Sequence, residues 1–424
     1  MTAPLPAQAP EAVLRRLFQA AVNAASPDFC LPPHLPPPPR GRTLVVGAGK
    51  AAAAMAAAVE RHWQGPLSGL VITRYGHGVP CRQVEVVEAA HPVTDDAGIR
   101  ATARMLDLLR GLTPDDLVLC LISGGGSALL AAPAPGLTLA DKQQVARTLL
   151  KSGATIAEMN CVRKHLSAVK GGRLARMAAP APIVTLLISD VPGDDPATIA
   201  SGPTLPDAGT RHDALAVLAK YGIDAPSTVT AWLSDPASET PKSLAELPPG
   251  RASVIATPAG AIAAAADLAR RMGIAPLFLG SAIEGEAREV AAWHADFVRN
   301  ITGGALPTPR PCLLLSGGET SVTVRGKGRG GRNAEFLLAL AVQLDGQPGV
   351  HALAADTDGI DGSEDNAGAW IGPDILARAT QAGINPRRHL EDNDGYGFFQ
   401  TLGNLLFTGP TRTNVNDFRA ILIE

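Results

Sequence analysis

The sequence lacks the features that mark several classes of protein. It has only five cysteines in 424 residues, widely spaced and without a Cys-x-x-Cys pair, which favours reduced thiols over a disulfide framework. No stretch reaches the roughly 18 unbroken apolar residues of a membrane span. The N-terminal segment EAVLRRLFQAAVNAA is amphipathic, unlike a signal peptide. A soluble, cytoplasmic protein is therefore expected.

The chain also lacks an excess of positive charge. It has 37 Lys and Arg residues and 40 Asp and Glu residues, which gives a formal net charge of −3. Proteins that coat nucleic acid leave a strongly basic footprint instead. We therefore expect neither nucleic acid nor a membrane as a partner.

Short apolar runs alternate with helical patterns along most of the chain. A helix is expected at about Glu11–Ala24, and a strand, turn and helix over 43–62. Further strands are expected at 69–74, 84–90, 116–123 and 182–189, and this alternation predicts a parallel sheet with helices on its faces. A polar, Pro-rich segment near Asp235–Gly250 predicts a boundary between an α/β domain over 1–240 and a second α/β domain over 251–424.

Polar or Gly-rich segments follow several predicted strands. In an open α/β sheet, ligands bind outside the carboxyl ends of the strands, so these segments are candidate sites. They are GAGK (Gly47–Lys50), SGGGS (Ser123–Ser127), SDVPGDD (Ser189–Asp195), SGGET (Ser316–Thr320) and DTDGIDG (Asp356–Gly362).

The Gly-rich segments predict backbone amides that could hold a phosphate or carboxylate. The alternative is that they are tight turns, or that their glycines let a helix pack close to a strand. GAGK is not a full G-x-G-x-x-G, because position 52 is Ala, and it lacks the further residues of a Walker A motif. The candidate binding residues are Gly47, Gly49, Lys50, Ser123, Gly124, Gly125, Gly126, Ser127, Gly317, Gly318 and Glu319.

Two acidic segments suit Mg²⁺, which takes one or two protein carboxylates together with phosphate oxygens and water. Asp190 follows an apolar strand directly, with Asp195 in the turn after it, and Asp356 and Asp358 follow a later strand. Exposed turn residues are the alternative for both segments. DTDGIDG is not an EF-hand loop, because Asp361 stands where that loop requires Gly.

Two segments gather cations. RGKGRGGRNAEF (Arg325–Phe336) precedes a predicted helix, whose N-terminus adds partial positive charge, and it predicts a compliant anion clamp in which Arg332 grips a carboxylate or phosphate. A solvated hairpin is the alternative. The segment MNCVRKHLSAVKGGRLARM places Arg163, Lys164, Lys170 and Arg173 on a helix expected to end at Gly171-Gly172. These charges could equally form a solvated face of that helix. His91 precedes a helix cap and is more often structural than catalytic.

Phosphoryl transfer needs amides and cations for phosphates and carboxylates for a metal ion, so a small-molecule kinase is favoured. A nicotinamide dehydrogenase built on VVGAGK is the competing enzyme, but the third Gly is absent and no acidic residue closes an early strand about 20 residues on. A module that binds sugar phosphates, without catalysis, leaves both acidic segments without a role.

The ordered set VVGAGKAA, HPVTDDAG, LISGGGSALL, NCVRKHLSAVKGGRLA, ISDVPGDDPATIASGPT, LLSGGETSVTV, GRGGRNAEF, DTDGIDG and TGPTRTNVNDF resembles the class II glycerate kinases, or glycerate 2-kinases. These carry a MOFRL-type C-terminal region, here about 311–424, and have often been labelled hydroxypyruvate reductases. The resemblance implies ATP-dependent phosphorylation of D-glycerate on its 2-hydroxyl, with Mg²⁺. It also implies a cleft between a larger Rossmann-like N-terminal domain and a smaller C-terminal domain.

On the matching positions, the resemblance implies Lys50 and Arg332 as charge-stabilising residues and Asp190 as the acidic residue of the site. We expect the metal ligands among Asp190, Asp195 and Asp358, without ranking them against Asp356. The partners would be D-glycerate and ATP, in a monomer or homodimer. An NAD(P)-dependent hydroxypyruvate reductase and a sugar-phosphate-binding module are the alternatives.

Overall fold

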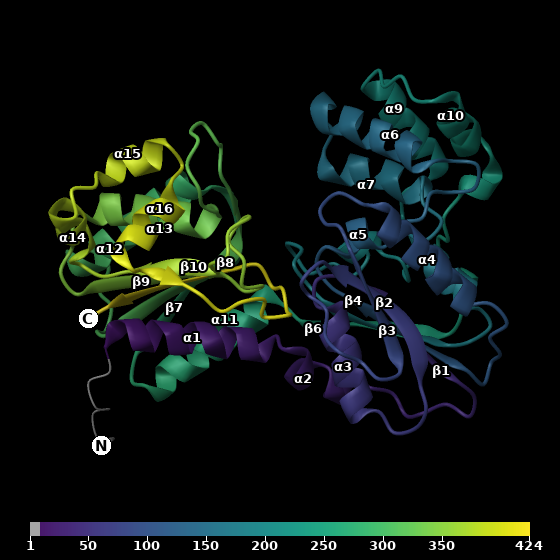
Figure 1. Cartoon of the computed structure of the whole chain (residues 1–424), viewed down its shortest axis with the longest axis horizontal. Coiled ribbons are helices and arrows are strands. Elements are labelled where there is room, and N and C mark those ends of the chain that lie inside the picture. Colours follow the sequence, from purple (N-terminus) through teal and green to yellow (C-terminus); the bar gives the residue numbers. More distant parts are fainter. Residues whose placement is uncertain (1–8) are drawn as a thin grey trace. The chain divides into compact units, whose positions relative to one another are not determined.

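The computed structural model describes residues 9–424, which form two compact units, each built on a six-stranded sheet (Figure 1). One unit is Cys30–Ile255, and the other joins the chain before Cys30 to Ala256–Glu424. The units therefore divide at about residue 255, slightly beyond the expected boundary. The N-terminal helix, expected in the first domain, packs in the second unit.

The sheet of the Cys30–Ile255 unit has the strand order β3-β2-β1-β4-β5-β6. Strands β1 to β5 run parallel, and every residue of β1, β4 and β5 is buried, as a parallel sheet covered on both faces requires. This is a Rossmann-type order whose direction reverses between β1 and β4, and such a reversal creates a crevice at the carboxyl ends of the strands. The strands are β1 (Thr43–Ala48), β2 (Ser68–Arg74), β3 (Val84–Ala89), β4 (Leu117–Ile122), β5 (Ile183–Ile188) and β6 (Gly250–Ala256).

Some helices of this unit cover the sheet, and others form a layer with its own apolar core. Helices α6, α7, α9 and α10 make that layer, with Val145, Val162 and Val229 in its core. Helix α7 ends at His165 and not at the expected Gly171-Gly172. The helices are α3 (Ala52–His62), α4 (Asp96–Leu108), α5 (Gly126–Leu129), α6 (Leu139–Ser152), α7 (Ile156–His165), α8 (Arg173–Ala178), α9 (Arg211–Lys220) and α10 (Ser227–Ser234), with 3-10 turns at Pro32–His34, Ile199–Ser201, Pro236–Ser238 and Leu244–Glu246.

The sheet of the other unit is mixed, with the order β11-β10-β9-β12-β8-β7. The last strand, β12, lies between β8 and β9 and runs antiparallel to both, whereas β7 and β8 are parallel. Alternating strands and helices predicted this α/β domain but not its mixed pairing. The strands are β7 (Ala275–Glu286), β8 (Cys312–Ser321), β9 (Val350–Asp356), β10 (Gly368–Ile371), β11 (Leu405–Leu406) and β12 (Asp417–Ile423).

Helices cover both faces of this second sheet. In Figure 1, α1 and α11 lie on one face and α12, α13 and α16 on the other. The alternation of β12 explains the two layers, because Phe418 packs against Phe18 of α1, with ring centroids 5.7 Å apart, while Ile421 and Ile423 enter the core beneath α13. The helices are α1 (Pro10–Ala24), α2 (Pro27–Cys30), α11 (Pro258–Arg271), α12 (Ala287–Thr302), α13 (Arg332–Leu344), α14 (Ile375–Gln381), α15 (Pro386–Glu391) and α16 (Gly395–Leu402).

None of the five cysteines forms a disulfide bond. Burial raises the pKa of Cys120 to about 12 and that of Cys161 to about 11, so these thiols stay protonated at neutral pH. Within residues 9–424, no helix combines the length and the apolar character needed to cross a membrane.

Candidate functional site

The loops after β1 and β4 lie side by side at the reversal point of the first sheet. The amide of Lys50 donates to the carbonyl oxygen of Gly124 at 2.8 Å, and the amide of Ala51 donates to Ser123 Oγ at 2.9 Å. These amides are therefore used within the protein. The expectation that GAGK offers them to a phosphate does not hold in this structure, because they join the two loops.

Close packing accounts for two of the candidate glycines. A methyl group on Gly47 would lie 2.0 Å from the carbonyl oxygen of Leu121, and one on Gly49 would lie 2.2 Å from Ser123 Oγ. Gly49 also has φ +142°, which favours glycine. Strands β1 and β4 thus require these glycines whether or not a ligand binds.

The SGGGS loop after β4 keeps two backbone donors. The amides of Gly124 and Gly125 donate to no acceptor within residues 9–424, and Gly125 adopts φ +78°. A methyl group built at Gly125 would lie 2.9 Å from His91 Nε2 and 3.5 Å from Lys50 Cγ. The imidazole of His91 and the side-chain stem of Lys50 therefore lie beside a loop that keeps two amide donors, a set of groups that suits an oxyanion. Sequence reasoning treated His91 as structural.

The same loop continues into a buried polar cluster. Lys170 Nζ donates to the carbonyl oxygen of Ser127 at 2.7 Å and to its Oγ at 3.1 Å, and Ser127 Oγ lies 2.8 Å from Ser201 Oγ. Lys170 and Arg173 are buried, so the solvated-face interpretation fails for both. Their segment does not continue α7 but turns inward beneath the loop.

The SDVPGDD segment follows β5. Asp190 is half-buried there, directly at the carboxyl end of the strand. Asp195 accepts from the amide of Ala197 at 3.1 Å and from Thr198 Oγ1 at 2.7 Å, the turn role given above as the alternative. Asp194, which lies with Asp195 in the predicted turn, has φ +54°, and its buried Oδ1 has no hydrogen-bond partner in the described chain.

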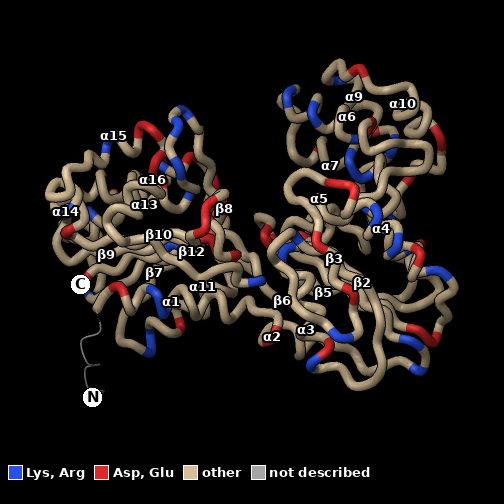
Figure 2. The backbone as a smooth tube through the Cα atoms, viewed as in Figure 1, with Lys and Arg blue, Asp and Glu red and all other residues tan. Residues whose placement is uncertain are grey.

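In the other unit, Arg332 lies among three carboxylates. Its Nε donates to Asp417 at 2.8 Å, one Nη to Glu319 at 2.6 Å and the other to Asp356 at 2.8 Å. Burial lowers the pKa of Arg332, but the attraction of these carboxylates outweighs burial and raises the pKa above its usual value. Figure 2 shows acidic segments beside β8 at this place, and basic segments beside α7 in the first unit. Arg332 thus uses three of its five donors within the protein.

The N-terminus of α13 is also occupied. Asp361 accepts from the amides of Asn333 and Ala334, each at 2.9 Å, and is fully buried. Burial raises the pKa of Asp361 to about 6. The partial charge of the helix, expected to serve a bound anion, is therefore already balanced by a side chain.

The glycine-rich loop before α13 is held and not compliant. The amides of Arg325 and Gly326 donate to Asn393 Oδ1 at 2.8 and 3.0 Å, and the Arg329 guanidinium lies 4.3 Å from the centre of the Tyr396 ring. A methyl group on Gly326 would lie 2.2 Å from the carbonyl oxygen of Asp392. These glycines let two backbones touch.

The SGGET segment is part of β8 and not a loop after it. Gly318 has φ +126°, and a methyl group there would lie 2.2 Å from the amide nitrogen of Ile283 in the bulged β7. Gly317 and Glu319 belong to the same strand, and only Glu319 is exposed. Asp358 is buried and accepts from the amide of Ile360 at 2.9 Å.

The carboxylates can be tested against a metal ion. Within residues 9–424, no group of three or more His, Cys, Asp or Glu side chains is arranged to hold one. Mg²⁺ in kinases needs only one or two protein carboxylates, because phosphates and water complete its shell. Asp190 fits that need, since it stands at the carboxyl end of a sheet strand.

Two family descriptions match the chain: a domain of unknown function, DUF4147, over residues 13–234, and the MOFRL family over 312–417. A protein of Agrobacterium vitis, provisionally named a hydroxypyruvate reductase, is 54% identical and aligns over 97% of this chain and 94% of its own. A D-glycerate 2-kinase of Thermotoga maritima is 40% identical over 95% of each chain.

The fold agrees with these relatives. The crystal structure of a glycerate kinase from Thermotoga maritima matches with a TM-score of 0.90 and 39% identity, covering 98% of this chain and 100% of that one. A human glycerate kinase is 35% identical and covers 97% of this chain and 92% of its own. The resemblance drawn from the motifs is thereby confirmed, and the chain belongs to the family of DUF4147 and MOFRL proteins that includes the glycerate kinases.

Proposed function

We propose that this chain is a D-glycerate 2-kinase, which transfers the γ-phosphoryl group of ATP to the 2-hydroxyl of D-glycerate and releases 2-phosphoglycerate and ADP. Relatives from a bacterium and a mammal, aligned over nearly their whole length, carry glycerate kinase names and support the proposal. The observation that carries it is the packing of Lys50 and His91 beside Gly125, in a loop whose Gly124 and Gly125 amides donate to no acceptor within residues 9–424. Fixed donors at one point stabilise the charge of a phosphoryl group in transfer.

The residues of this site would divide the work. Lys50 would neutralise charge on the transferred group, and the amides of Gly124 and Gly125 would donate to its oxygens. Asp190 would hold Mg²⁺ or accept the proton of the 2-hydroxyl. Magnesium, bound with the nucleotide, supplies further neutralisation of the phosphates.

Arg332 keeps a supporting role in this proposal. Its three carboxylate contacts leave two N–H donors for one anionic group of a substrate. The same contacts make it the centre of a charge cluster, so its loss would act on folding as well as on binding.

A hydroxypyruvate reductase is the second candidate, favoured by the name of the Agrobacterium vitis relative and by a strand order common in dinucleotide-binding enzymes. Two features weigh against it. Ala52 replaces the third glycine of the dinucleotide motif, and the amides of Lys50 and Ala51 already donate to the β4 loop. The kinase is therefore the better supported activity.

The deciding experiment incubates the purified chain with D-glycerate, ATP and Mg²⁺ and separates 2-phosphoglycerate from 3-phosphoglycerate. A parallel reaction supplies hydroxypyruvate with NADH or NADPH. Magnesium-dependent formation of 2-phosphoglycerate without oxidation of the nicotinamide supports the kinase. Nicotinamide oxidation without a phosphorylated product refutes it.

A variant tests the place of the chemistry. Lys50→Met should lower kcat by roughly 100- to 1,000-fold, the usual cost of losing one donor to a charged transition state, with little change in glycerate affinity. Lys151→Met, on the exposed end of α6, is the matched control and should keep normal turnover. Near-normal kcat in the Lys50 variant would remove Lys50 from the mechanism.

A further inference from the structure

A small basic pocket lies beneath the SGGGS loop. It encloses about 120 Å³, and three cations line it: Lys142 from α6, Arg163 from α7, and Lys170 from the segment before α8. Ser127 and Gln143 are among its polar lining residues. We call this the basic pocket.

The positive charge of the basic pocket is not balanced by the protein. Within residues 9–424, no carboxylate forms an ion pair with any of its three cations, whereas the neighbouring Lys164 pairs with Asp207 at 3.1 Å. Lys170 Nζ contacts only oxygens of Ser127, and Lys142 Nζ lies 3.5 Å from the carbonyl oxygen of Ala132.

Both lysines of the basic pocket have lowered pKa values. Burial, followed by repulsion from Lys142, Arg163 and Lys164, lowers the pKa of Lys170 well below its usual value. Burial and Arg163 likewise lower the pKa of Lys142 to about 8. Unpaired charges in a partly buried pocket are unfavourable until an anion joins them. A ligand that fits the basic pocket is therefore expected to carry negative charge.

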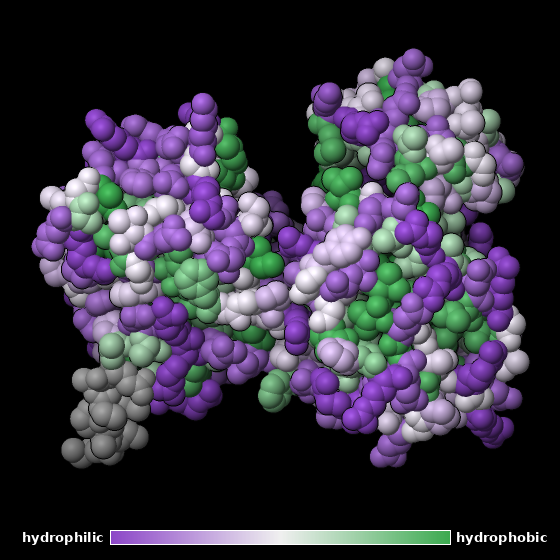
Figure 3. Space-filling model, in the orientation of Figure 1, coloured by the Kyte–Doolittle hydropathy of each residue, from purple (hydrophilic) through white to green (hydrophobic). Residues whose placement is uncertain are grey.

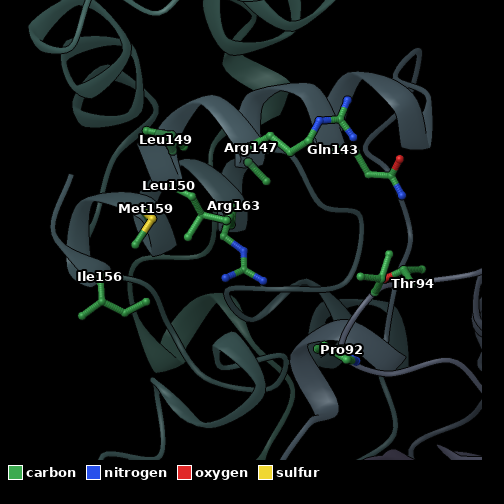
Figure 4. A pocket seen from close by; sticks show the side chains of 11 residues that line it. Pro92, Thr94, Gln143, Arg147, Leu149, Leu150, Ile156, Met159 and Arg163 are labelled. Carbon is green, nitrogen blue, oxygen red and sulfur yellow. The ribbon is translucent and has the colours of Figure 1, made fainter. Parts of the chain in front are cut away.

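A larger, more apolar pocket of about 400 Å³ adjoins the basic pocket and shares Arg163 and Thr94 with it. Figure 4 shows Arg163 projecting into it from α7, with Pro92 and Thr94 across from it. Leu150 and Ile156 are 70% and 64% exposed on its lining, and Figure 3 shows hydrophobic surface over this helical layer. The two pockets thus lie next to each other, with Arg163 lining both.

The size and the lining residues of the basic pocket indicate which kind of anion it can bind. A space of about 120 Å³ holds a carboxylate and a few atoms, not a nucleotide. The phosphates of a nucleotide arrive with a metal ion that protein carboxylates help to hold, and no Asp or Glu lines this pocket. The planar guanidinium of Arg163 matches a carboxylate through two parallel hydrogen bonds.

We propose that the basic pocket binds the carboxylate of the three-carbon acceptor acid, with Arg163, Lys142 and Lys170 as its counter-charges. This inference rests on the proposed kinase function. Ser127, which lines the pocket and accepts from Lys170, belongs to the same loop as Gly125, beside which Lys50 and His91 lie.

The test replaces Arg163, because no hydrogen bond or ion pair of its guanidinium within residues 9–424 is lost with it. Arg163→Gln should raise KM for D-glycerate roughly 10- to 100-fold, the worth of a charged hydrogen-bond pair, with KM for ATP unchanged. Arg176→Gln, exposed on α8, is the matched control and should behave as the wild type.

Two further measurements keep the test independent of folding and turnover. Calorimetric titration with D-glycerate alone, without ATP, should give weaker binding in Arg163→Gln and in Lys142→Met. Glyceramide, which has an uncharged amide in place of the carboxylate, should bind wild type and variants alike. Circular dichroism checks that each variant is folded.

The outcomes separate the two proposals. If wild type makes 2-phosphoglycerate but neither variant alters KM or binding of D-glycerate, the carboxylate subsite is refuted and the kinase stands. A higher KM for ATP alone assigns the pocket to nucleotide phosphates and also refutes the subsite. If wild type neither binds nor phosphorylates D-glycerate, both proposals fall.

Discussion

Replacing Arg332 by Met should destabilise the unit that holds it before it changes any chemistry. Arg332 balances Asp417, Asp356 and Glu319, and the first two carboxylates are buried. Met keeps most of the side-chain volume but leaves these charges facing one another. Arg419 still pairs with Asp417 at 2.6 Å, so Asp417 keeps one of the cations that the structure places beside it.

The expected magnitude follows from exposure. Breaking a buried ion pair by removing one partner costs about 3–5 kcal/mol. The lower end applies here, because Glu319 is half-exposed and the Arg332 side chain is 21% exposed. About 3 kcal/mol in a unit of this size lowers Tm by roughly 6–12 °C.

Differential scanning calorimetry of the whole chain measures the effect. Arg329→Met is the control, because its ion pair with Glu364 is largely solvated on the Arg side and should shift Tm by less than about 3 °C. The double variant Arg332→Met, Asp356→Asn should regain part of the loss. An Arg332 variant that melts within about 2 °C of wild type would refute the reasoning and leave Arg332 a purely functional residue.

Two predictions concern pH. KM for D-glycerate should rise as the pH increases through about 8, the depressed pKa of Lys142, because Lys142 then loses its positive charge. The charged groups that face Lys142 are Arg163 from α7 and Lys170 from the segment before α8. The variant Lys142→Arg should delay the rise in KM, and a wild-type KM that stays constant to pH 9 would count against Lys142 as a counter-charge. His294 is buried with its Nε2 2.8 Å from Ser316 Oγ, and burial lowers its pKa to about 4. Because the unfolded chain takes up this proton near pH 6.5, stability should be lost as pH falls from there towards 4, by about 2 kcal/mol between pH 7 and 5. Urea unfolding of wild type and His294→Gln measures it, and an equal pH dependence in both would exclude His294 as the cause.

The alternation of strands and helices was enough to predict the first sheet. Its strand order was not predictable from that pattern, because each crossover could return on either side of β1. The amphipathic pattern of α1 predicted a helix but not the surface against which it packs. Leu14 and Phe18 indicate only that some apolar surface must cover them. Strand β12 pairs with residues about 100 and 65 positions earlier, and no local pattern carries that information.

The site was predictable in position more than in detail. The SGGGS loop was found because consecutive glycines at the carboxyl end of a strand can offer backbone amides to an anion. Sequence reasoning could not find that Ser123 and Gly124 accept the amides of Ala51 and Lys50, because the two loops meet only in the folded chain. Lys170 looked like one more surface cation, and only the end of α7 at His165 turns it inward. Arg332 was identified, but its carboxylate partners come from three separate strands.

The placement of α1 separates the synthesis of this helix from the synthesis of the sheet that it covers. This helix is made before residues 30–255, yet the sheet it covers is complete only when β12 has been made. Residues 30–255 form a separate unit in between, and their translation alone takes roughly 10–45 s at about 5–20 residues per second. During that time the apolar face of α1, with Leu14, Leu17 and Phe18, has no native partner. The nascent chain thus carries the uncovered apolar face of α1 while residues 30–255 are made.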